Sequence, residues 1–211
     1  MTKEKREKLQ WILDNPAWGT GEMHQMSFRT ERGVHFMYSP EELQFLLSLI
    51  TKPPEGYDNL WIVEIGTGKA GTTAQMAAYQ ALKGFDLKVM TCAPTHKVEI
   101  EKELEPVKDY VTYYRLWDYL AIKCWQKKNP GARIWFLFLD NGHNYESVIN
   151  ELWAYAPLII PGGIIFVHDT RVGKLFGDGE INAMYDFCTW NPEFKIIDTK
   201  FESNKLIRRI G

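Results

Sequence analysis

Apolar positions follow two different spacings along the chain, and the two spacings alternate from about residue 39 onward. Short runs rich in β-branched residues are typical of buried strands, whereas apolar residues three or four positions apart are typical of amphipathic helices. Strands are predicted at residues 60–65, 87–92, 111–115, 134–140 and 163–168, and helices at 72–82, 96–108, about 118–128, 147–159 and 180–189, with a turn at Pro161-Gly162-Gly163. This alternation predicts an α/β fold with a mostly parallel sheet and helices on both faces.

The last eighteen residues depart from this alternation. Residues 194–198 and 206–210 are two further apolar stretches, joined by the polar turn 202–204. Two strands joined by so short a connection form an antiparallel hairpin. We therefore expect a C-terminal hairpin to place an antiparallel strand in the otherwise parallel sheet.

The N-terminal part carries few strand signals. Leu9, Ile12 and Leu13 predict an amphipathic helix that ends before Pro16, and Ser39 with Glu42 forms a capping box for a second helix running to about Ile50. We divide the chain into an N-terminal extension, residues 1–38, and a Rossmann-like domain, residues 39–211. The extension contains Trp18, His24 and Phe28, and we expect it to cover the site or to contribute to a homo-oligomer contact.

The amino-acid composition narrows the classes of protein to which the chain can belong. The 211 residues are 45% hydrophobic and 25% charged with a net charge of −2, so no global basic surface attracts nucleic acid or an anionic membrane. Three cysteines, Cys92, Cys124 and Cys188, form no close pair and indicate neither a disulfide framework nor a zinc site. The charged N-terminal segment lacks the apolar centre of a signal peptide. A cytoplasmic protein is the expectation.

A glycine-rich turn follows the first predicted strand. The segment VEIGTGKAGTT places Gly66, Gly68 and Gly71 in a G-x-G-x-x-G pattern between a strand and a helix, which is the context that nucleotide-binding turns require. It is not a P-loop, because Thr72 stands where that motif has lysine. A βα turn without a ligand is the alternative interpretation.

Several motifs in order resemble the class I S-adenosylmethionine-dependent methyltransferases. They are VEIGTGKAGTT, LDNGHNYESV, APLIIPGGIIFVHDT, the closing FKIIDT and NKLIRRI, and the lead-in SPEELQFLLSLI. More narrowly, they are similar to the small-molecule O-methyltransferases that include cephalosporin-hydroxylase-like proteins. The resemblance implies a Rossmann-like seven-stranded sheet and an S-adenosylmethionine-dependent O-methyltransferase. Its partner would be a small hydroxylated acceptor, with neither a membrane nor a nucleic acid expected.

The same resemblance assigns residues to the cofactor. It places Glu64, Gly66, Thr67 and Gly68 at the methionine part of S-adenosylmethionine, and Trp117 at the adenine, although Trp117 equally suits core packing. The second strand departs from the family, because Ala93 stands where an acid would bind the ribose. Thr91 or Thr95 would have to bind the ribose instead, and a neutral hydroxyl is a weaker acceptor than a carboxylate.

The resemblance also predicts the reacting groups. Metal-dependent relatives hold Mg²⁺ with an aspartate after the fourth strand and an acid pair after the fifth, and carry a histidine base three residues beyond the first aspartate. Asp140, His143 and Asp169 match, whereas His168 replaces an acid and shifts the preference from Mg²⁺ toward a softer divalent metal. We therefore predict His143 as the catalytic base and Asp140, His168 and Asp169 as metal ligands, with Asp140 also contacting the cofactor.

Simpler roles for these residues stay open. Asp140 and Asn144 would suit a helix cap, His143 an exposed loop, and His168 a structural histidine. Arg171 and Lys174, after the fifth strand, lie either in an acceptor-site lid or in a solvated loop. The alternative function is a catalytically impaired methyltransferase-like module for binding or assembly. A nicotinamide-dependent reductase and a nucleic-acid methyltransferase agree less well with the hairpin and with the net charge.

Overall fold

The structure is a computed structural model, and it describes residues 1–15, 40–94, 98–170, 178–201 and 204–211. Trp18, His24, Phe28, Thr95, Arg171 and Lys174 lie outside these residues. The chain separates into two compact units. The first comprises residues 1–52, 67–89 and 96–112, and the second comprises residues 53–66, 90–95 and 113–211.

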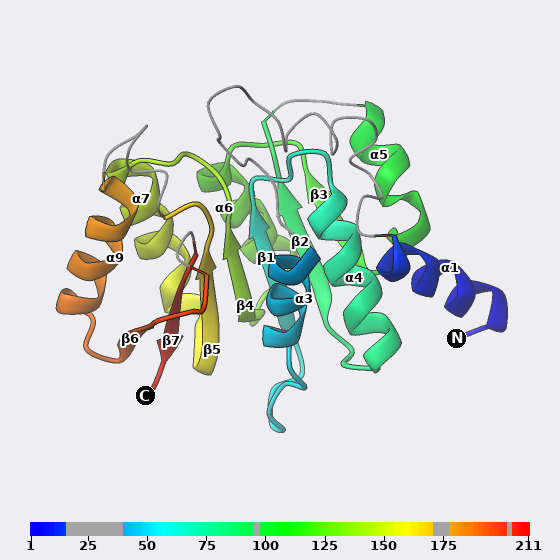
Figure 1. The fold of residues 1–211 in the computed structure, drawn as a ribbon, viewed down its shortest axis with the longest axis horizontal. Helices are drawn as coiled ribbons and strands as arrows, with labels where there is room; N and C mark the ends of the chain where they lie inside the picture. Colours follow the sequence, from blue (N-terminus) through cyan, green and yellow to red (C-terminus); the bar gives the residue numbers. More distant parts are fainter. Residues whose placement is uncertain (16–39, 95–97, 171–177, 202–203) are drawn as a thin grey trace. The chain divides into compact units, whose positions relative to one another are not determined.

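Seven strands form one sheet in the order β3-β2-β1-β4-β5-β7-β6 (Figure 1). The strands are β1 (Leu60–Ile65), β2 (Lys88–Cys92), β3 (Val111–Tyr114), β4 (Arg133–Leu139), β5 (Ile159–Val167), β6 (Phe194–Ile197) and β7 (Lys205–Arg209). β4 pairs in parallel with β1 and β5, whereas β7 is antiparallel to both β5 and β6. The Rossmann-like, mostly parallel sheet with a C-terminal antiparallel hairpin is therefore confirmed.

The helices follow the strands in the predicted alternation. They are α1 (Lys3–Asp14), α3 (Pro40–Leu49), α4 (Gly71–Lys83), α5 (Val98–Leu104), α6 (Asp118–Lys128), α7 (Tyr145–Tyr155) and α9 (Gly179–Trp190), with short 3₁₀ helices η1 (Glu105–Val107) and η2 (Ala156–Leu158). Within the described residues, no helix combines the length and the apolar character needed to cross a membrane.

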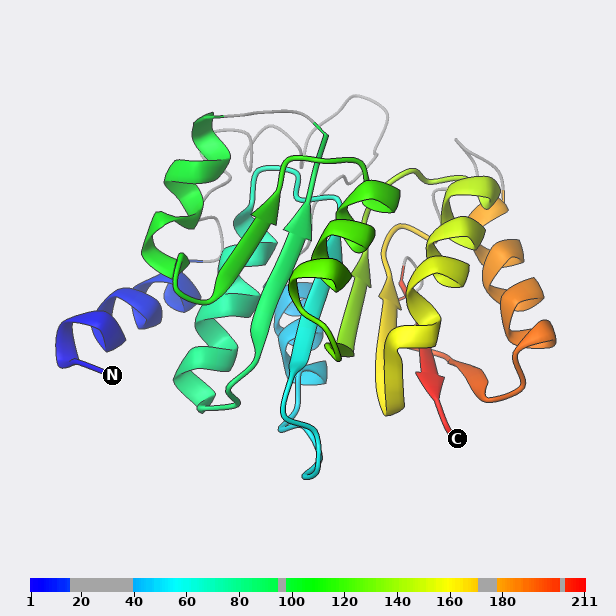
Figure 2. The ribbon, with the colours of Figure 1, turned by 180° about the vertical axis from the view of Figure 1, so that it is seen from behind.

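The core of the second unit lies between the sheet and three helices. Every residue of β1 is buried, and alternate residues such as Val63 and Ile65 join one hydrophobic cluster with side chains of α6, α7 and α9. Figure 2 shows α6 and α7 in front of the strands of this unit, with α9 beside α7. Trp61 meets Trp125 edge to face at 5.6 Å between ring centroids. This packed layer fixes the carboxyl ends of β1, β4 and β5, where the candidate site lies.

In the first unit, α1 packs against α4. Leu9 and Ile12 are buried, as the amphipathic pattern predicted, and Thr2 caps the helix by accepting a hydrogen bond from the backbone N–H of Lys5. The buried Gln75 of α4 donates to the backbone carbonyl of Ile12. The N-terminal helix is therefore confirmed, and it is an integral part of the first unit.

The predicted C-terminal ends of two helices are wrong, and proline explains both. The helix expected over 147–159 ends at Tyr155 and continues as η2, which contains Pro157, and the helix expected over 96–108 ends at Leu104 before η1, which contains Pro106. Proline lacks the N–H that a continuing α-helix requires.

The predicted turn at residues 161–163 lies inside β5. Ile134 of β4 pairs with Ile159 and Phe136 pairs with Ile164, so β5 bulges at Ile160–Gly163 without leaving the sheet. Gly162 adopts a φ of 83°, and a Cβ on Gly163 would lie 2.6 Å from Ile159 Cγ2. The glycines therefore serve a bulge near the start of β5, at the end of the strand away from the candidate site.

Candidate active site at the ends of β1, β4 and β5

Three chain segments leave the sheet side by side at its carboxyl edge. The backbone N–H of Asp140 donates to the carbonyl of Ile65 at 2.9 Å, and that of His168 donates to the carbonyl of Leu139 at 3.0 Å. Asp140, His168 and Asp169 therefore begin immediately beyond the last ladder bonds of neighbouring strands. This is the edge at which open α/β sheets bind their ligands.

His168 is a buried link between the two aspartates. Its Nδ1 lies 2.9 Å from Asp140 Oδ1 and 3.5 Å from Asp169 Oδ2, and its ring meets Phe138 edge to face. Asp169 is itself buried and adopts a left-handed φ of 58°, which is unusual for a residue with a side chain. Burial raises the pKa of Asp169, with the neighbouring His168 acting in the opposite direction.

His143 reaches the same site from the loop that joins β4 to α7. Its Nδ1 lies 2.7 Å from Glu180 Oε1 at the start of α9, and its side chain is 30% exposed. The hydrogen bond to Glu180 raises the pKa of His143, burial opposes this, and the charges of Asp140 and Asp169 add to the increase. The helix-capping role belongs to Asn144, whose Oδ1 accepts from the backbone N–H of Ser147 at 2.9 Å.

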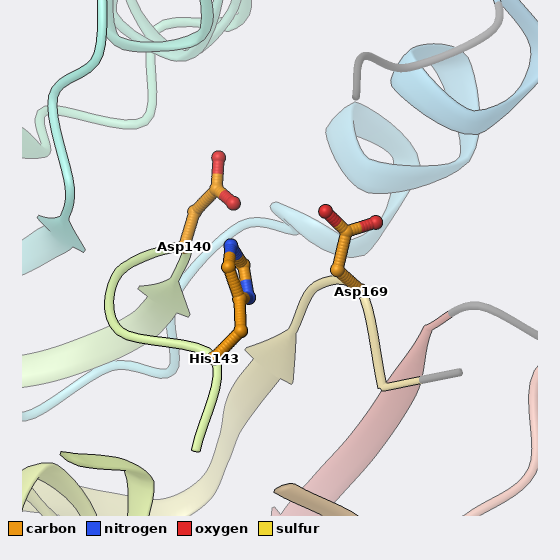
Figure 3. A group of neighbouring side chains, drawn as sticks. All are labelled: Asp140, His143 and Asp169. Atoms are coloured by element: carbon orange, nitrogen blue, oxygen red, sulfur yellow. The ribbon is translucent and has the colours of Figure 1, made fainter. Parts of the chain in front are cut away.

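Figure 3 shows the side chains of Asp140, His143 and Asp169 gathered over the strand ends. One potential ligand atom from each lies within 4.8 Å of the others. Two carboxylates and an imidazole suit a borderline divalent metal better than Mg²⁺, which prefers oxygen ligands alone. His143 takes the place in this group that the sequence assigned to His168, whose Nδ1 already contacts Asp140.

Glu64 and Thr91, both assigned to the cofactor, are bonded to each other. The hydroxyl of Thr91 donates to Glu64 Oε2 at 2.7 Å, and both side chains are buried. Trp117 differs from them, because it is 55% exposed at the start of α6 and presents an open indole surface. The contact of Glu64, Thr91 and Trp117 with a cofactor stays a prediction.

The glycine turn contains two glycines with different physical requirements. Gly66 has a φ of 99°, and a Cβ there would lie 2.0 Å from the carbonyl oxygen of Asp140. Gly68, in the first unit, has a φ of 54°, and a Cβ there would meet no atom of the described residues within 4 Å. Gly66 is therefore demanded by packing against the end of β4, whereas the backbone of Gly68 is open for the approach of a ligand. Thr67, between them, is buried.

A family model described as "Methyltransferase domain" matches residues 63–170, about half of the chain. The chain belongs to this methyltransferase family. The match begins in β1 and ends just after Asp169, so it includes the glycine turn and all four residues predicted to carry the chemistry. No curated protein sequence matches the chain significantly.

Solved structures of other methyltransferases share the fold at low sequence identity. An O-methyltransferase from Bacillus cereus in complex with SAH is 15% identical, with a TM-score of 0.63 over 97% of this chain and 91% of that one. TomG from Streptomyces achromogenes, an O-methyltransferase of tomaymycin synthesis in complex with SAM, is 16% identical, with a TM-score of 0.63 over 95% and 90%. The calicheamicin methyltransferase CalS11 is 11% identical, with a TM-score of 0.65 over 99% and 93%. At these identities the likeness shows the class I methyltransferase fold.

Two acidic residues of this candidate site were not identified from the sequence. Glu180, which holds His143, was read only as the beginning of a helix, and Glu151 was read only as part of one. Glu151 is buried on α7 and accepts a hydrogen bond from Asn141 Nδ2 at 3.0 Å, which ties the loop after β4 to the helix. The sequence signal for Glu151 was its place among Val148, Ile149 and Leu152 on the buried face of α7.

Proposed function

We propose that this methyltransferase transfers a methyl group from S-adenosylmethionine to a hydroxyl of a small molecule. The proposal rests on the position of His143, whose partly exposed imidazole is held by Glu180 beside Asp140 and Asp169. Membership of a methyltransferase family supplies the reaction class. SAH and SAM in the structures of the Bacillus cereus enzyme and TomG support the cofactor, and their names as O-methyltransferases support oxygen as the acceptor atom.

His143 is suited to accept the proton of the acceptor hydroxyl. When Nδ1–H donates to Glu180, the lone pair lies on Nε2, and the hydroxyl proton moves to that nitrogen. The carboxylates of Asp140 and Asp169 favour the resulting imidazolium through their charge. S-adenosylmethionine, when bound, supplies a sulfonium methyl carbon that the hydroxyl oxygen attacks, while the C–S electron pair returns to sulfur.

We assign a divalent cation to the carboxylates of Asp140 and Asp169. His168, which the sequence predicted as a further ligand, has its Nδ1 engaged by Asp140, so we propose that it holds this carboxylate in place. Such a cation would lower the pKa of an acceptor hydroxyl and orient it. His143 cannot bind the cation through Nε2 and accept a proton there at the same time. We therefore keep His143 as the base, which leaves the two carboxylates as the protein ligands of the cation, a donor set that Mg²⁺ and other divalent cations accept.

Cofactor binding is assigned to the edge formed by the ends of β1, β2 and β3. Trp117 supports this because its exposed indole can stack on adenine. The open backbone of Gly68 suits its predicted role in cofactor binding. Glu64, Gly66, Thr67, Thr91 and Asp140 complete the proposed set. At Ala93, where relatives carry an acid, the ribose would have no carboxylate partner.

Calorimetry with S-adenosylmethionine and S-adenosylhomocysteine tests the cofactor, and transfer of a labelled methyl group to a panel of phenols, catechols and sugars tests the reaction. Absence of binding of both compounds at millimolar concentration would refute the proposal. Binding without transfer to any acceptor would favour the alternative, a module used for binding or assembly.

The role of His143 is tested by His143→Gln in the same assays. We expect turnover to fall by roughly 10²- to 10⁴-fold, which is the usual contribution of a general base. The dissociation constant for S-adenosylmethionine should stay within about twofold, because the base does not hold the cofactor. Loss of cofactor binding in this variant would contradict the assignment of His143 as the base.

A further inference from the structure

Glu180 is a buried carboxylate in the first turn of α9, and its hydrogen bond to His143 compensates the cost of its burial. Its side chain is 6% exposed, and its Oε1 lies 2.7 Å from His143 Nδ1. Burying a carboxylate is costly unless a donor compensates it. The pairing therefore constrains both partners, because neither the carboxylate nor the imidazole can turn away without leaving a buried acid unpaired.

Three contacts hold the start of α9 against the start of α7. A Cβ on Gly179 would lie 2.7 Å from the backbone nitrogen of Tyr145, so only glycine allows this approach. The hydroxyl of Tyr145 donates to Asp186 Oδ2 at 2.8 Å, about two turns beyond Gly179 along α9. The Glu180–His143 bond is the third contact, and it is the one that reaches the reacting group.

We infer that Glu180 is a positioning residue that fixes His143 in the tautomer protonated at Nδ1. A carboxylate accepts and cannot donate, so neutral His143 must place its proton on Nδ1 to make this bond. The lone pair then lies on Nε2, on the side of the ring away from Glu180. The catalytic role of this tautomer rests on the proposed function. The tautomer itself does not, because it is a property of the protein without substrate.

The tautomer is measured by long-range ¹H–¹⁵N correlation spectroscopy of the full-length protein, with the His143 signals assigned from His143→Gln. We expect wild-type His143 to be protonated at Nδ1 in its neutral form. Glu180→Leu removes the acceptor and should transfer most of the population to the Nε2-protonated form. Glu180→Gln retains an acceptor oxygen of the same shape and should keep a majority at Nδ1, which guards against a folding defect in the leucine variant.

Asp186→Leu is the matched control, because it likewise replaces a hydrogen-bonded carboxylate of α9 by leucine and removes the acceptor of Tyr145 without touching His143. It should leave the tautomer unchanged. The inference is overturned if wild-type His143 is mainly protonated at Nε2, if Glu180→Leu leaves the population unchanged, or if Asp186→Leu shifts it equally.

Measurements of turnover distinguish a failure of this inference from a failure of the proposed function. With any acceptor found in the panel, Glu180→Leu should lower kcat at least tenfold while KM for S-adenosylmethionine stays within about twofold. A protein that binds no S-adenosylmethionine but shows the expected tautomers would refute the proposed function and leave the Glu180–His143 pairing intact. A protein that methylates normally in the Glu180→Leu variant would refute the positioning role alone.

Discussion

His143 and His168 lie at the same edge of the sheet, but different partners and different exposure suit them to different roles. His168 is 4% exposed, with Nδ1 between two carboxylates, whereas His143 is 30% exposed and bonded to a glutamate from another helix. A proton acceptor must reach the substrate, so exposure favours His143 as the base. The buried position of His168 suits a residue that keeps Asp140 and Asp169 together.

Ala93 is the residue at which the proposed cofactor site is weakest. It is partly exposed just after β2, and its backbone N–H is held by the carbonyl of Tyr114, so a longer side chain there would extend from a fixed backbone. We predict that Ala93→Asp tightens binding of S-adenosylmethionine by roughly ten- to a hundredfold, because a charged hydrogen bond contributes about 1.5–3 kcal/mol. Titration calorimetry measures the change.

The control for this prediction is Ala93→Asn, which has nearly the same shape without the charge. It should give a smaller gain than the aspartate. Equal gains for the two variants, or weaker binding by Ala93→Asp, would show that the ribose hydroxyls do not lie near residue 93.

At the residue scale, the sequence identified the groups that follow the strand ends and missed the groups that support them. Asp140, His168 and Asp169 were predictable because parallel strands deliver their carboxyl ends to one edge. Glu180 lies 37 residues beyond His143, and no local pattern encodes how closely α9 approaches α7. That approach depends on Gly179 and on packing between the helices, which single-sequence periodicity does not specify.

At the scale of elements, the turn between β1 and α4 couples two strand ends. Gly66 leaves β1 with its Cα against the carbonyl of Asp140, and its N–H donates to the carbonyl of Cys92 at 3.4 Å. The sequence correctly marked this turn by its glycines, but it could not show that Gly66 is required by β4. A position needs glycine either when a neighbouring strand packs closely against it or when a ligand needs room there. The sequence shows the same residue in both cases.

Alanine substitutions distinguish the two requirements in this turn. Gly66→Ala combines a left-handed backbone with a Cβ placed 2.0 Å from a backbone oxygen, so we expect it to lower the free energy of unfolding by roughly 3 kcal/mol or more. Gly68→Ala has open space and should cost only about 1–2 kcal/mol from its backbone conformation. Urea denaturation of both variants measures the difference. Equal losses would show that the close approach of Asp140 does not determine the need for glycine.

Strand and helix order were predictable, whereas some boundaries were not. The bulge at residues 160–163 was read as a turn because Pro-Gly-Gly is common in turns. Pairing with β4 on both sides keeps these residues in β5, and that pairing joins segments far apart in the sequence. The hydrogen bonds between β4 and β5 therefore outweigh the local preference of Pro-Gly-Gly for a turn.

At the scale of the whole molecule, the buried carboxyl of Glu151 links the stability of the fold to pH. It is 2% exposed, and burial raises its pKa to about 8 from an ordinary value of 4.5, although the hydrogen bond from Asn141 acts in the opposite direction. Among the described residues, its Oε2 has no hydrogen-bond partner. Glu151 is therefore neutral in the folded protein at neutral pH, while the unfolded chain would ionise it.

This difference in pKa gives a stability profile with a definite sign. Between pH 4.5 and about 8 the folded state holds a proton that the unfolded state has released, so each rise of one pH unit lowers the free energy of unfolding by up to about 1.4 kcal/mol from this group. Glu151→Gln keeps the shape and the acceptor for Asn141 but removes the ionisation. We predict that its stability relative to wild type rises between pH 4.5 and 8 and is constant above and below this window. Urea denaturation of both proteins at pH 4.5, 6 and 8 measures this, and a difference independent of pH would show that Glu151 is ionised in the folded protein.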